Sequence, residues 1–350
     1  MQINDLNKYI QDRVKSLKPF VFYRLSKESD TYLLESNTID FVSDFQYKES
    51  GFIFHPFDSK KNKIEFIKGT PSKTAIVKGA STLITLKDLS REEKPFCSTF
   101  ELYQNQFNIF QEEFINRSMK KAILSRIKFM EIDKLDVANM FLKMLSAYPE
   151  AYAYLYYSPS AGLWIGASPE KFVFVHHNIL ETTALAGTIS EGENWSDKEK
   201  EEQMIVTHFI TQNLHELNHL EADAPETIKA GNLYHIRANI RGELNAQSNL
   251  SSIINKLHPT PAVGGFPKEK ALEMIAAVEK HKREFYSGFA GPVNINSSTH
   301  LFVNLRCAKI YPAGLSLFVG GGITKSSEVK KEWEETEKKA NTIANMILNH

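Results

Sequence analysis

Hydrophobic and polar residues follow two different periods along this 350-residue chain. In residues 20–89, short runs of β-forming residues are separated by Asn, Asp, Lys, Gly and Pro, a pattern typical of antiparallel strands joined by hairpins. In residues 1–20, apolar positions recur every three to four residues, which predicts an amphipathic helix. The same period predicts a helix over residues 99–117, and its aromatic stripe is expected to enter the core.

The rest of the chain mixes strand-like segments with three helical ones. The run KKAILSRIKFMEI at residues 120–132 alternates like a strand. The helical period covers residues 197–220, 268–280 and 326–348. Long strands combined with a few long helices predict an α+β (layered α/β) fold.

A polar segment ending in proline, SREEKP at residues 90–95, is the expected linker between two regions of the chain. Residues 1–95 are expected to be the β-rich N-terminal part, and residues 96–350 to carry the chemistry. We expect the two regions to form one intertwined structural unit.

Composition narrows the choice of partner. The chain has 42 Lys+Arg and 42 Asp+Glu and therefore no net charge, so no bulk field would draw it to nucleic acid or to an acidic membrane surface. Two cysteines, Cys97 and Cys307, are too few for a disulfide framework and suit a reducing cytoplasm. No stretch approaches the roughly 20 apolar residues of a membrane span. A small molecule is the expected partner.

Two helical segments place pairs of glutamates beside their apolar stripes. Glu199 and Glu202 share a face with the apolar residues of the first segment, and Glu332 and Glu335 do the same in the last one. All-oxygen ligands of this kind suit Mg²⁺. The alternatives are a solvated charge run and structural ion pairs, such as Glu335 with Lys339.

Two further motifs have competing interpretations. The HELNH run at residues 215–219 fits the zinc-protease pattern, but its phase places His215 and His219 opposite the apolar stripe, and the sequence indicates neither a third ligand nor a sheltered cavity. The glycine-rich FVGGGITKS run at residues 318–326 predicts either a tight turn or a backbone nest that binds a carboxylate.

Nine ordered motifs resemble those of the chorismate-utilising enzymes, and the resemblance covers about two thirds of the chain, from residue 120 to the end. The motifs are KAILSR (121–126), SPEKF (168–172), LAGT (185–188), DKEKEE (197–202), LHPTPAVGG (257–265), YSGFAG (286–291), LRC (305–307), GGGI (320–323) and EWEETEKKA (332–340). The resemblance implies large central antiparallel sheets flanked by helices, an active site between them, and a requirement for Mg²⁺.

The resemblance also implies roles for individual residues. Lys121 would activate water, and Glu170 would protonate the departing C4 hydroxyl, which requires a carboxyl of raised pKa. The metal would be held by glutamates from two helices, namely Glu202 and Glu335 with Glu199 and Glu332. Chorismate would be bound by Thr188, His235, Tyr286, Arg306, Gly320, Gly322 and Lys339.

Within this family, two positions favour water as the nucleophile. Ala186 stands where aminodeoxychorismate synthases have a nucleophilic lysine, and Lys121 stands where anthranilate synthases lack one. The implied reaction converts chorismate to isochorismate, and the alternatives are salicylate synthesis and a catalytically inactive chorismate-binding module. We expect a cytoplasmic monomer without a glutamine amidotransferase subunit, serving menaquinone or siderophore biosynthesis.

Overall fold

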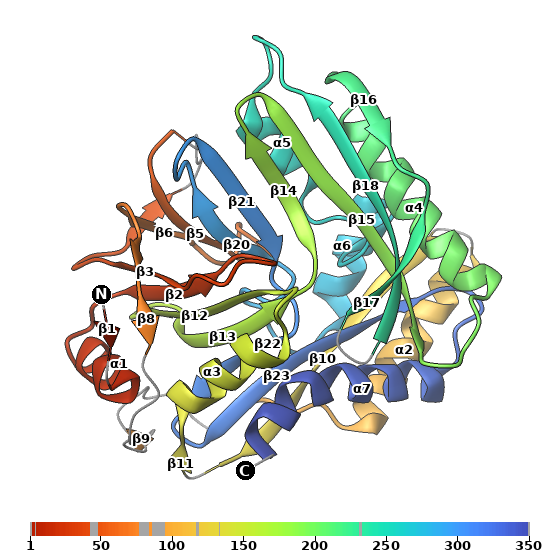
Figure 1. Cartoon of the computed structure of the whole chain (residues 1–350). Coiled ribbons are helices and arrows are strands. Elements are labelled where there is room, and N and C mark those ends of the chain that lie inside the picture. Colours follow the sequence, from red (N-terminus) through yellow and green to blue (C-terminus); the bar gives the residue numbers. More distant parts are fainter. Residues whose placement is uncertain are drawn as a thin grey trace.

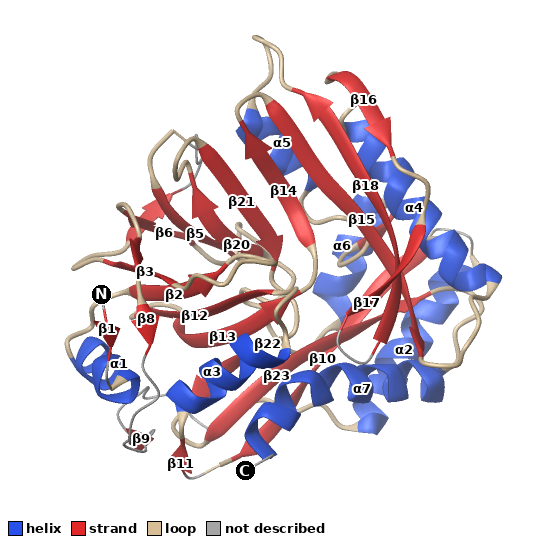
Figure 2. Cartoon of the chain, in the orientation of Figure 1, coloured by secondary structure: helices blue, strands red, loops and turns tan. Residues whose placement is uncertain are grey.

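Two large antiparallel sheets, with helices on their outer faces, organise the computed structural model (Figure 1). The structure describes residues 2–3, 5–42, 48–76, 84–85, 95–116, 119–132, 134–230 and 233–348. Within these residues there are seven helices (Figure 2): α1 (Leu6–Lys15), α2 (Phe100–Ile115), α3 (Val137–Ala147), α4 (Asp197–Asn213), α5 (Leu250–Leu257), α6 (Lys268–Val278) and α7 (Val329–Leu348). The predicted α+β fold is therefore confirmed.

The first sheet has nine strands within the described residues. Their order across the sheet is β19 (Gly265–Phe266), β10 (Lys121–Glu131), β23 (Gly314–Ile323), β22 (Cys307–Tyr311), β13 (Gly162–Ser168), β12 (Tyr152–Ser158), β2 (Phe20–Arg24), β3 (Tyr32–Glu35) and β7 (Ser72–Lys73). The long β10–β23 pair crosses the base of the molecule and ends at the site described below.

The second sheet has ten strands in the described part of the chain. Nine follow one another in the order β16 (Asn218–Ala222), β18 (Leu233–Glu243), β15 (Ile179–Ser190), β14 (Lys171–His176), β21 (Ser298–Val303), β20 (Phe289–Val293), β5 (Gly51–His55), β6 (Ile64–Lys68) and β4 (Asp40–Val42). The tenth, β17 (Glu226–Ala230), also pairs with β18. Two short pairs lie apart: β1 (Gln2–Ile3) with β8 (Ala75–Ile76), and β9 (Ile84–Thr85) with β11 (Lys134–Leu135).

Strands from the first 95 residues enter both sheets. β2 pairs with β12 in the first sheet, and β5 pairs with β20 in the second. These pairings join the N-terminal part of the chain to strands from its middle and its end. The predicted linker at residues 90–95 lies almost wholly outside the described residues.

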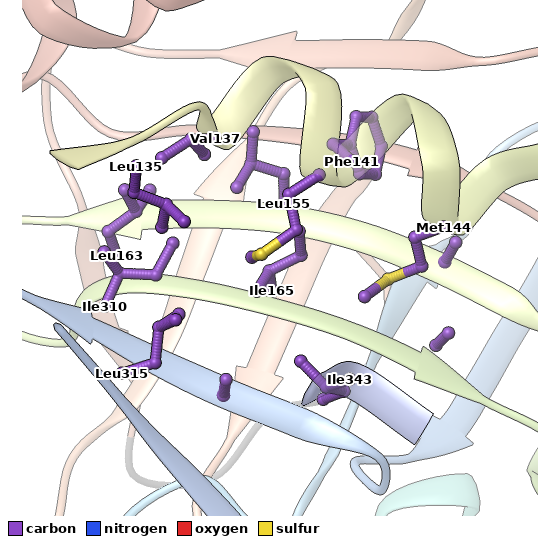
Figure 3. Close-up of a cluster of buried hydrophobic side chains, with 14 of the residues drawn as sticks. Leu135, Val137, Phe141, Met144, Leu155, Leu163, Ile165, Ile310, Leu315 and Ile343 are labelled. Atoms are coloured by element: carbon purple, nitrogen blue, oxygen red, sulfur yellow. The ribbon is translucent and has the colours of Figure 1, made fainter. Parts of the chain in front are cut away.

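Buried side chains form layers on both sides of each sheet. An aromatic layer between the sheets contains Tyr154, Trp164 and Phe318. On the outer face of the first sheet, α1, α3 and α7 bury a cluster of aliphatic and aromatic side chains, and Figure 3 shows Phe141 and Met144 of α3 on the side of the sheet that carries Leu155 and Ile165. Further clusters join α4 and α5 to the second sheet and α2 and α6 to β10. Burying apolar area in these layers is the main favourable term in folding.

Most predicted elements are confirmed, but the structure corrects two. The helix predicted over residues 197–220 ends at Asn213, because Leu214 and Leu217 are buried and Asn218–Ala222 pairs with the edge of β18. The glycine-rich run at residues 318–326 is not a turn at its glycines, since β23 continues through them to Ile323. The sequence analysis also missed α3 and α5, each of which begins after an Asp or Asn cap. No helix among the described residues is long and apolar enough to cross a membrane.

Candidate active site

A cavity opens where β10, β15, β18 and β23 meet the facing sides of α4 and α7. Including the solvent space at its open mouth, it encloses about 730 Å³. One part of the wall is apolar, formed by Ile123, Leu185, Ala262, Val263, Leu305 and Phe318. The other part is charged and polar.

The charged wall gathers most of the residues predicted from the sequence. The cavity is lined by Lys121, Glu170, Thr188, Glu202, His235, Tyr286, Arg306, Gly320, Gly322, Glu335 and Lys339. The other two predicted residues, Glu199 and Glu332, line an adjoining cleft that shares Thr188 and Glu335 with the cavity. Segments as far apart in sequence as Lys121 and Lys339 thus converge on one space.

Carboxylates and ammonium groups alternate at the junction of α4 and α7. The Nζ atom of Lys121 lies 3.2 Å from Oε2 of Glu202, and both side chains are almost fully buried. Lys198, which the sequence analysis did not select, places its Nζ atom 2.5 Å from Oε1 of Glu332 and 3.7 Å from Oε1 of Glu202. Its position four residues before Glu202 was the available signal, because residues at that spacing share a helix face.

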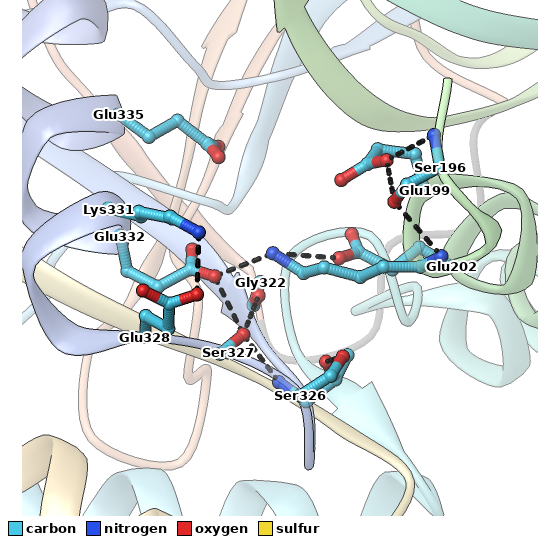
Figure 4. A network of polar contacts seen from close by, with 12 residues as sticks. Ser196, Glu199, Glu202, Gly322, Ser326, Ser327, Glu328, Lys331, Glu332 and Glu335 are labelled. Atoms are coloured by element: carbon cyan, nitrogen blue, oxygen red, sulfur yellow. Dashed lines mark hydrogen bonds and ion pairs between the residues drawn. The ribbon is translucent and has the colours of Figure 1, made fainter. Parts of the chain in front are cut away.

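The remaining glutamates have their own partners. Glu335 forms an ion pair with Lys339, in which Oε1 lies 2.6 Å from Nζ. Burial opposes the ionisation of Glu335, but the charge of Lys339 lowers the pKa of this carboxyl group below its usual value. Glu332 accepts a hydrogen bond from Ser327, as Figure 4 shows. Burial and then the nearby charge of Glu335 raise the pKa of Glu332. Glu199 uses Oε2 to complete the capping box of α4 with Ser196.

The oxygen donors of these carboxylates have the chemistry that suits a hard divalent cation, although their spacing in this structure does not form a closed site. The Oε2 atom of Glu332 is buried and accepts no hydrogen bond from the described residues, and the facing carboxylates supply only oxygen, which Mg²⁺ prefers. As the side chains stand, no three acidic, His or Cys side chains in the described ranges form a metal-binding group. The Lys198 ammonium lies among the carboxylates instead, so a metal ion would compete with it for them.

The glycines of β23 have no side chains, and this leaves space for the side chains of the site. A Cβ atom on Gly322 would lie 2.8 Å from Oε2 of Glu202, and one on Gly321 would lie 3.2 Å from Oε2 of Glu332. A Cβ atom on Gly320 would approach the Tyr286 hydroxyl to 3.0 Å. Glycine is used in a strand where other groups approach the backbone closely, so the run forms the floor of the site rather than a turn.

Glu170, the glutamate of the SPE motif, lies just after the end of β13 and lines the cavity. Burial raises the pKa of Glu170 to about 8, although the charges of Lys121 and Lys339 act in the opposite direction. At neutral pH the carboxyl group of Glu170 is therefore protonated in most molecules. A buried carboxyl that keeps its proton near pH 7 has the property that a general acid requires.

The neutral imidazole of His235 lies beside the positively charged guanidinium of Arg306. The Nδ1 atom of His235 lies 2.8 Å from the carbonyl oxygen of Gly187, and Nε2 lies 3.5 Å from Nη2 of Arg306. Burial, followed by the charge of Arg306, lowers the pKa of His235 to about 3. The imidazole is thus neutral, and the Nδ1–H tautomer donates to Gly187. The pairing of β15 with β18 shifts register between Ala186 and Ile189, and within this stretch Oγ1 of Thr188 lies 3.3 Å from Nδ1 of His235.

The HELNH segment does not form a zinc site in the structure. Helix α4 ends before His215, whose Nδ1 atom lies 2.6 Å from the carbonyl oxygen of Gln212. His219 lies in β16, and both histidines are exposed. A pair of zinc ligands four residues apart requires a continuous helix, which is absent here.

Fold and site together define a two-sheet α+β protein whose cavity is lined by Arg306 and by buried and half-buried lysine–glutamate ion pairs. The chain belongs to the chorismate binding enzymes, because residues 72–348 match the model of that family.

Known proteins of this kind are similar in sequence and in structure. The isochorismate synthase EntC of Escherichia coli (strain K12) is 29% identical over 246 residues, which cover 66% of this chain and 63% of that protein. A protein from Bacillus anthracis described as a 2,3-dihydroxybenzoate-specific isochorismate synthase superposes with a TM-score of 0.79 at 21% identity, covering 97% of this chain and 99% of the other. The structure of the menaquinone-specific isochorismate synthase MenF of Escherichia coli superposes with a TM-score of 0.75 at 20% identity, covering 94% of this chain and 88% of the other. The match therefore spans less than two thirds of EntC, and the two structural likenesses establish the fold.

Proposed function

We propose that this protein converts chorismate to isochorismate. The proposal is carried by one observation: Lys121 and the protonated Glu170 line the same cavity. The proposal is supported by the similarity to the isochorismate synthase EntC, which covers 66% of this chain.

In the proposed reaction, Lys121 acts as a neutral amine, after giving one proton to solvent, and takes a proton from a water molecule as the water oxygen bonds to C2 of the ring. The ring double bonds shift, the C4–O bond breaks, and Glu170 gives its proton to the departing hydroxyl, which leaves as water. One water enters and one leaves, so the conversion is an isomerisation. Transfer of protons by positioned side chains of this kind typically contributes 10²–10⁴-fold to a rate.

The two carboxylates of the substrate would be held at opposite ends of the cavity. Arg306 and Tyr286 would hold the side-chain carboxylate, because a guanidinium suits a carboxylate fork. At the other end, Glu202, Glu335, Glu332 and Glu199 would hold Mg²⁺. Once bound, the metal would supply charge stabilisation to a substrate carboxylate and to the leaving oxygen. His235, Thr188, Lys339 and the strand backbone at Gly320 and Gly322 would contact the rest of the ligand.

We further infer that the chain acts in the cytoplasm, as a monomer and without an amidotransferase subunit. Water needs no partner subunit to deliver it, unlike ammonia, and the two free cysteines suit a reducing compartment.

The test is incubation of the purified chain with chorismate and Mg²⁺, followed by chromatography of isochorismate, salicylate, anthranilate and pyruvate. Isochorismate should appear, and a chelator should stop its formation. Salicylate together with pyruvate would instead identify a salicylate synthase. If chorismate were not consumed, the proposed function would be wrong.

A further inference from the structure

Two surface clefts of opposite charge adjoin the active-site cavity. We define the basic cleft by Lys27, Lys229, Arg237 and Arg306, together with Glu150, the one carboxylate lining it among the described residues. This cleft shares Arg306 and Pro169 with the cavity. Arg306 and Pro169 thus lie at the boundary between this cleft and the cavity.

The acidic cleft adjoins the cavity at other residues. Within the described part of the chain it is lined by six carboxylates and three lysines: Glu193, Glu199, Glu328, Glu332, Glu334, Glu335, Lys198, Lys331 and Lys338. It shares Thr188 and Glu335 with the cavity. The cavity thus has one neighbouring cleft of each sign.

The cations of the basic cleft are arranged from its rim inward. Lys229 is exposed on β17, with its ammonium 5.5 Å from the ring centre of Tyr234. Lys27 pairs with Glu150 at 3.6 Å, and Arg237 pairs with Glu226, so those two cations are largely compensated. Lys229 therefore contributes the main outer positive charge, and Arg306 carries the charge at the boundary with the cavity.

We propose that the basic cleft is the entrance through which an anionic dicarboxylate reaches the active site, with Lys229 as the steering charge. The chemical identity of that anion, chorismate, rests on the proposed function. Clefts lined by one sign of charge focus the field and raise the association rate of oppositely charged ligands. The acidic cleft repels the same ligand, so the two charges give the substrate one preferred approach.

Association kinetics test this entrance directly. Binding of chorismate with Mg²⁺ is followed by stopped-flow tryptophan fluorescence in a Lys121→Ala background, which prevents turnover. Trp164 is a suitable reporter, because its ring stacks on Phe318 of the cavity wall with 5.1 Å between ring centres. A single charge about 10 Å from a dianion changes its encounter rate about fourfold in water at low salt. We expect Lys229→Gln to slow association about fourfold and Lys229→Glu on the order of tenfold, with both effects shrinking as salt is added.

Lys331→Glu is the matched control, because Lys331 is equally exposed but lines the acidic cleft. It should change the association rate by less than about twofold. A steric pair gives independent evidence: Ala147→Trp narrows the basic cleft, and Ser326→Trp narrows the acidic one. Only the first should slow association and dissociation together while leaving the dissociation constant unchanged.

The possible outcomes separate the entrance from the function. If chorismate binds and the rate is insensitive to Lys229 and to Ala147→Trp, the entrance is refuted while the proposed function stands. If Lys331→Glu and Ser326→Trp are the slow variants, the ligand enters by the acidic cleft and the proposal is equally wrong. If chorismate neither binds nor reacts with the unmodified chain, the proposed function fails, and this entrance for chorismate fails with it.

Discussion

Replacing Glu170 by glutamine should separate activity from stability. The amide has nearly the same shape and faces the same cavity, but it has no carboxyl proton to give. If Glu170 is the general acid, formation of isochorismate should fall by roughly 10²–10⁴-fold. The same change should make the protein more stable at neutral pH, because the native state no longer has to keep a carboxyl group protonated.

The size of this gain follows from the pKa of Glu170, which burial raises from 4.5 to about 8. Between these pH values the native state binds a proton that the unfolded chain releases, so the free energy of unfolding falls as pH rises. Each pH unit above 4.5 costs about 1.4 kcal/mol, which gives about 3 kcal/mol at pH 7 and about 5 kcal/mol above pH 8. The substitution should remove this loss, and its advantage should vanish at pH 4.5 and below.

Urea unfolding at a series of pH values from 4.5 to 8.5 measures the effect. Glu334→Gln is the control, since Glu334 is exposed on α7, and its unfolding profile should follow that of the unmodified protein. A stability difference for Glu170→Gln that stays constant with pH would refute the argument from burial. Undiminished turnover would show that Glu170 is not the acid.

Four substitutions and one chelation experiment test other parts of the site and one buried ion pair outside it. Lys121→Ala should reduce isochorismate formation at least 10²-fold with an unchanged circular dichroism spectrum, and near-normal turnover would exclude Lys121 as the base. Gly322→Ala should lower turnover measurably, because its Cβ atom would lie 2.8 Å from Oε2 of Glu202; unaffected kinetics would mean that this contact does not matter. Arg283→Met should destabilise the fold by about 3–5 kcal/mol in urea, since it leaves the buried Glu279 without its charge partner, now 2.6 Å away; Arg283→Lys should cost less, and equal losses would contradict this reason. Removal of divalent metal with EDTA should abolish turnover, and Mg²⁺ should restore it; activity that persists would contradict a metal requirement.

Helical phase predicted the inward-facing carboxylates correctly. Glu202 and Glu332 are almost fully buried, as expected from their alignment with apolar positions on α4 and α7. Periodicity could not show which cation would face them. The pairing of Lys198 with Glu332 joins residues 134 positions apart, and only the packing of α4 beside α7 brings them together.

The errors at element ends have a common physical cause. Residues 214–220 continue the helical period, yet pairing with β18 and burial of Leu217 against Gly242 favour a turn and a strand instead. Local propensity is a weak prior that tertiary contacts override. The missed helix α3 is different, because the apolar spacing and the Asp136 cap were both present in the sequence.

The zero net charge of the chain does not show how the charged residues are distributed in the folded protein. Charge count alone excluded a bulk field, but it could not show that the fold gathers acids and bases in separate places. The turn after β15, α4 and α7 bring carboxylates to one cleft beside the cavity, whereas β17 and β18 bring Lys229 and Arg237 to the cleft that Arg306 lines. A ligand with two carboxylates therefore meets a strong local field in a neutral protein. Its orientation in the cavity follows from which of its ends each field can hold.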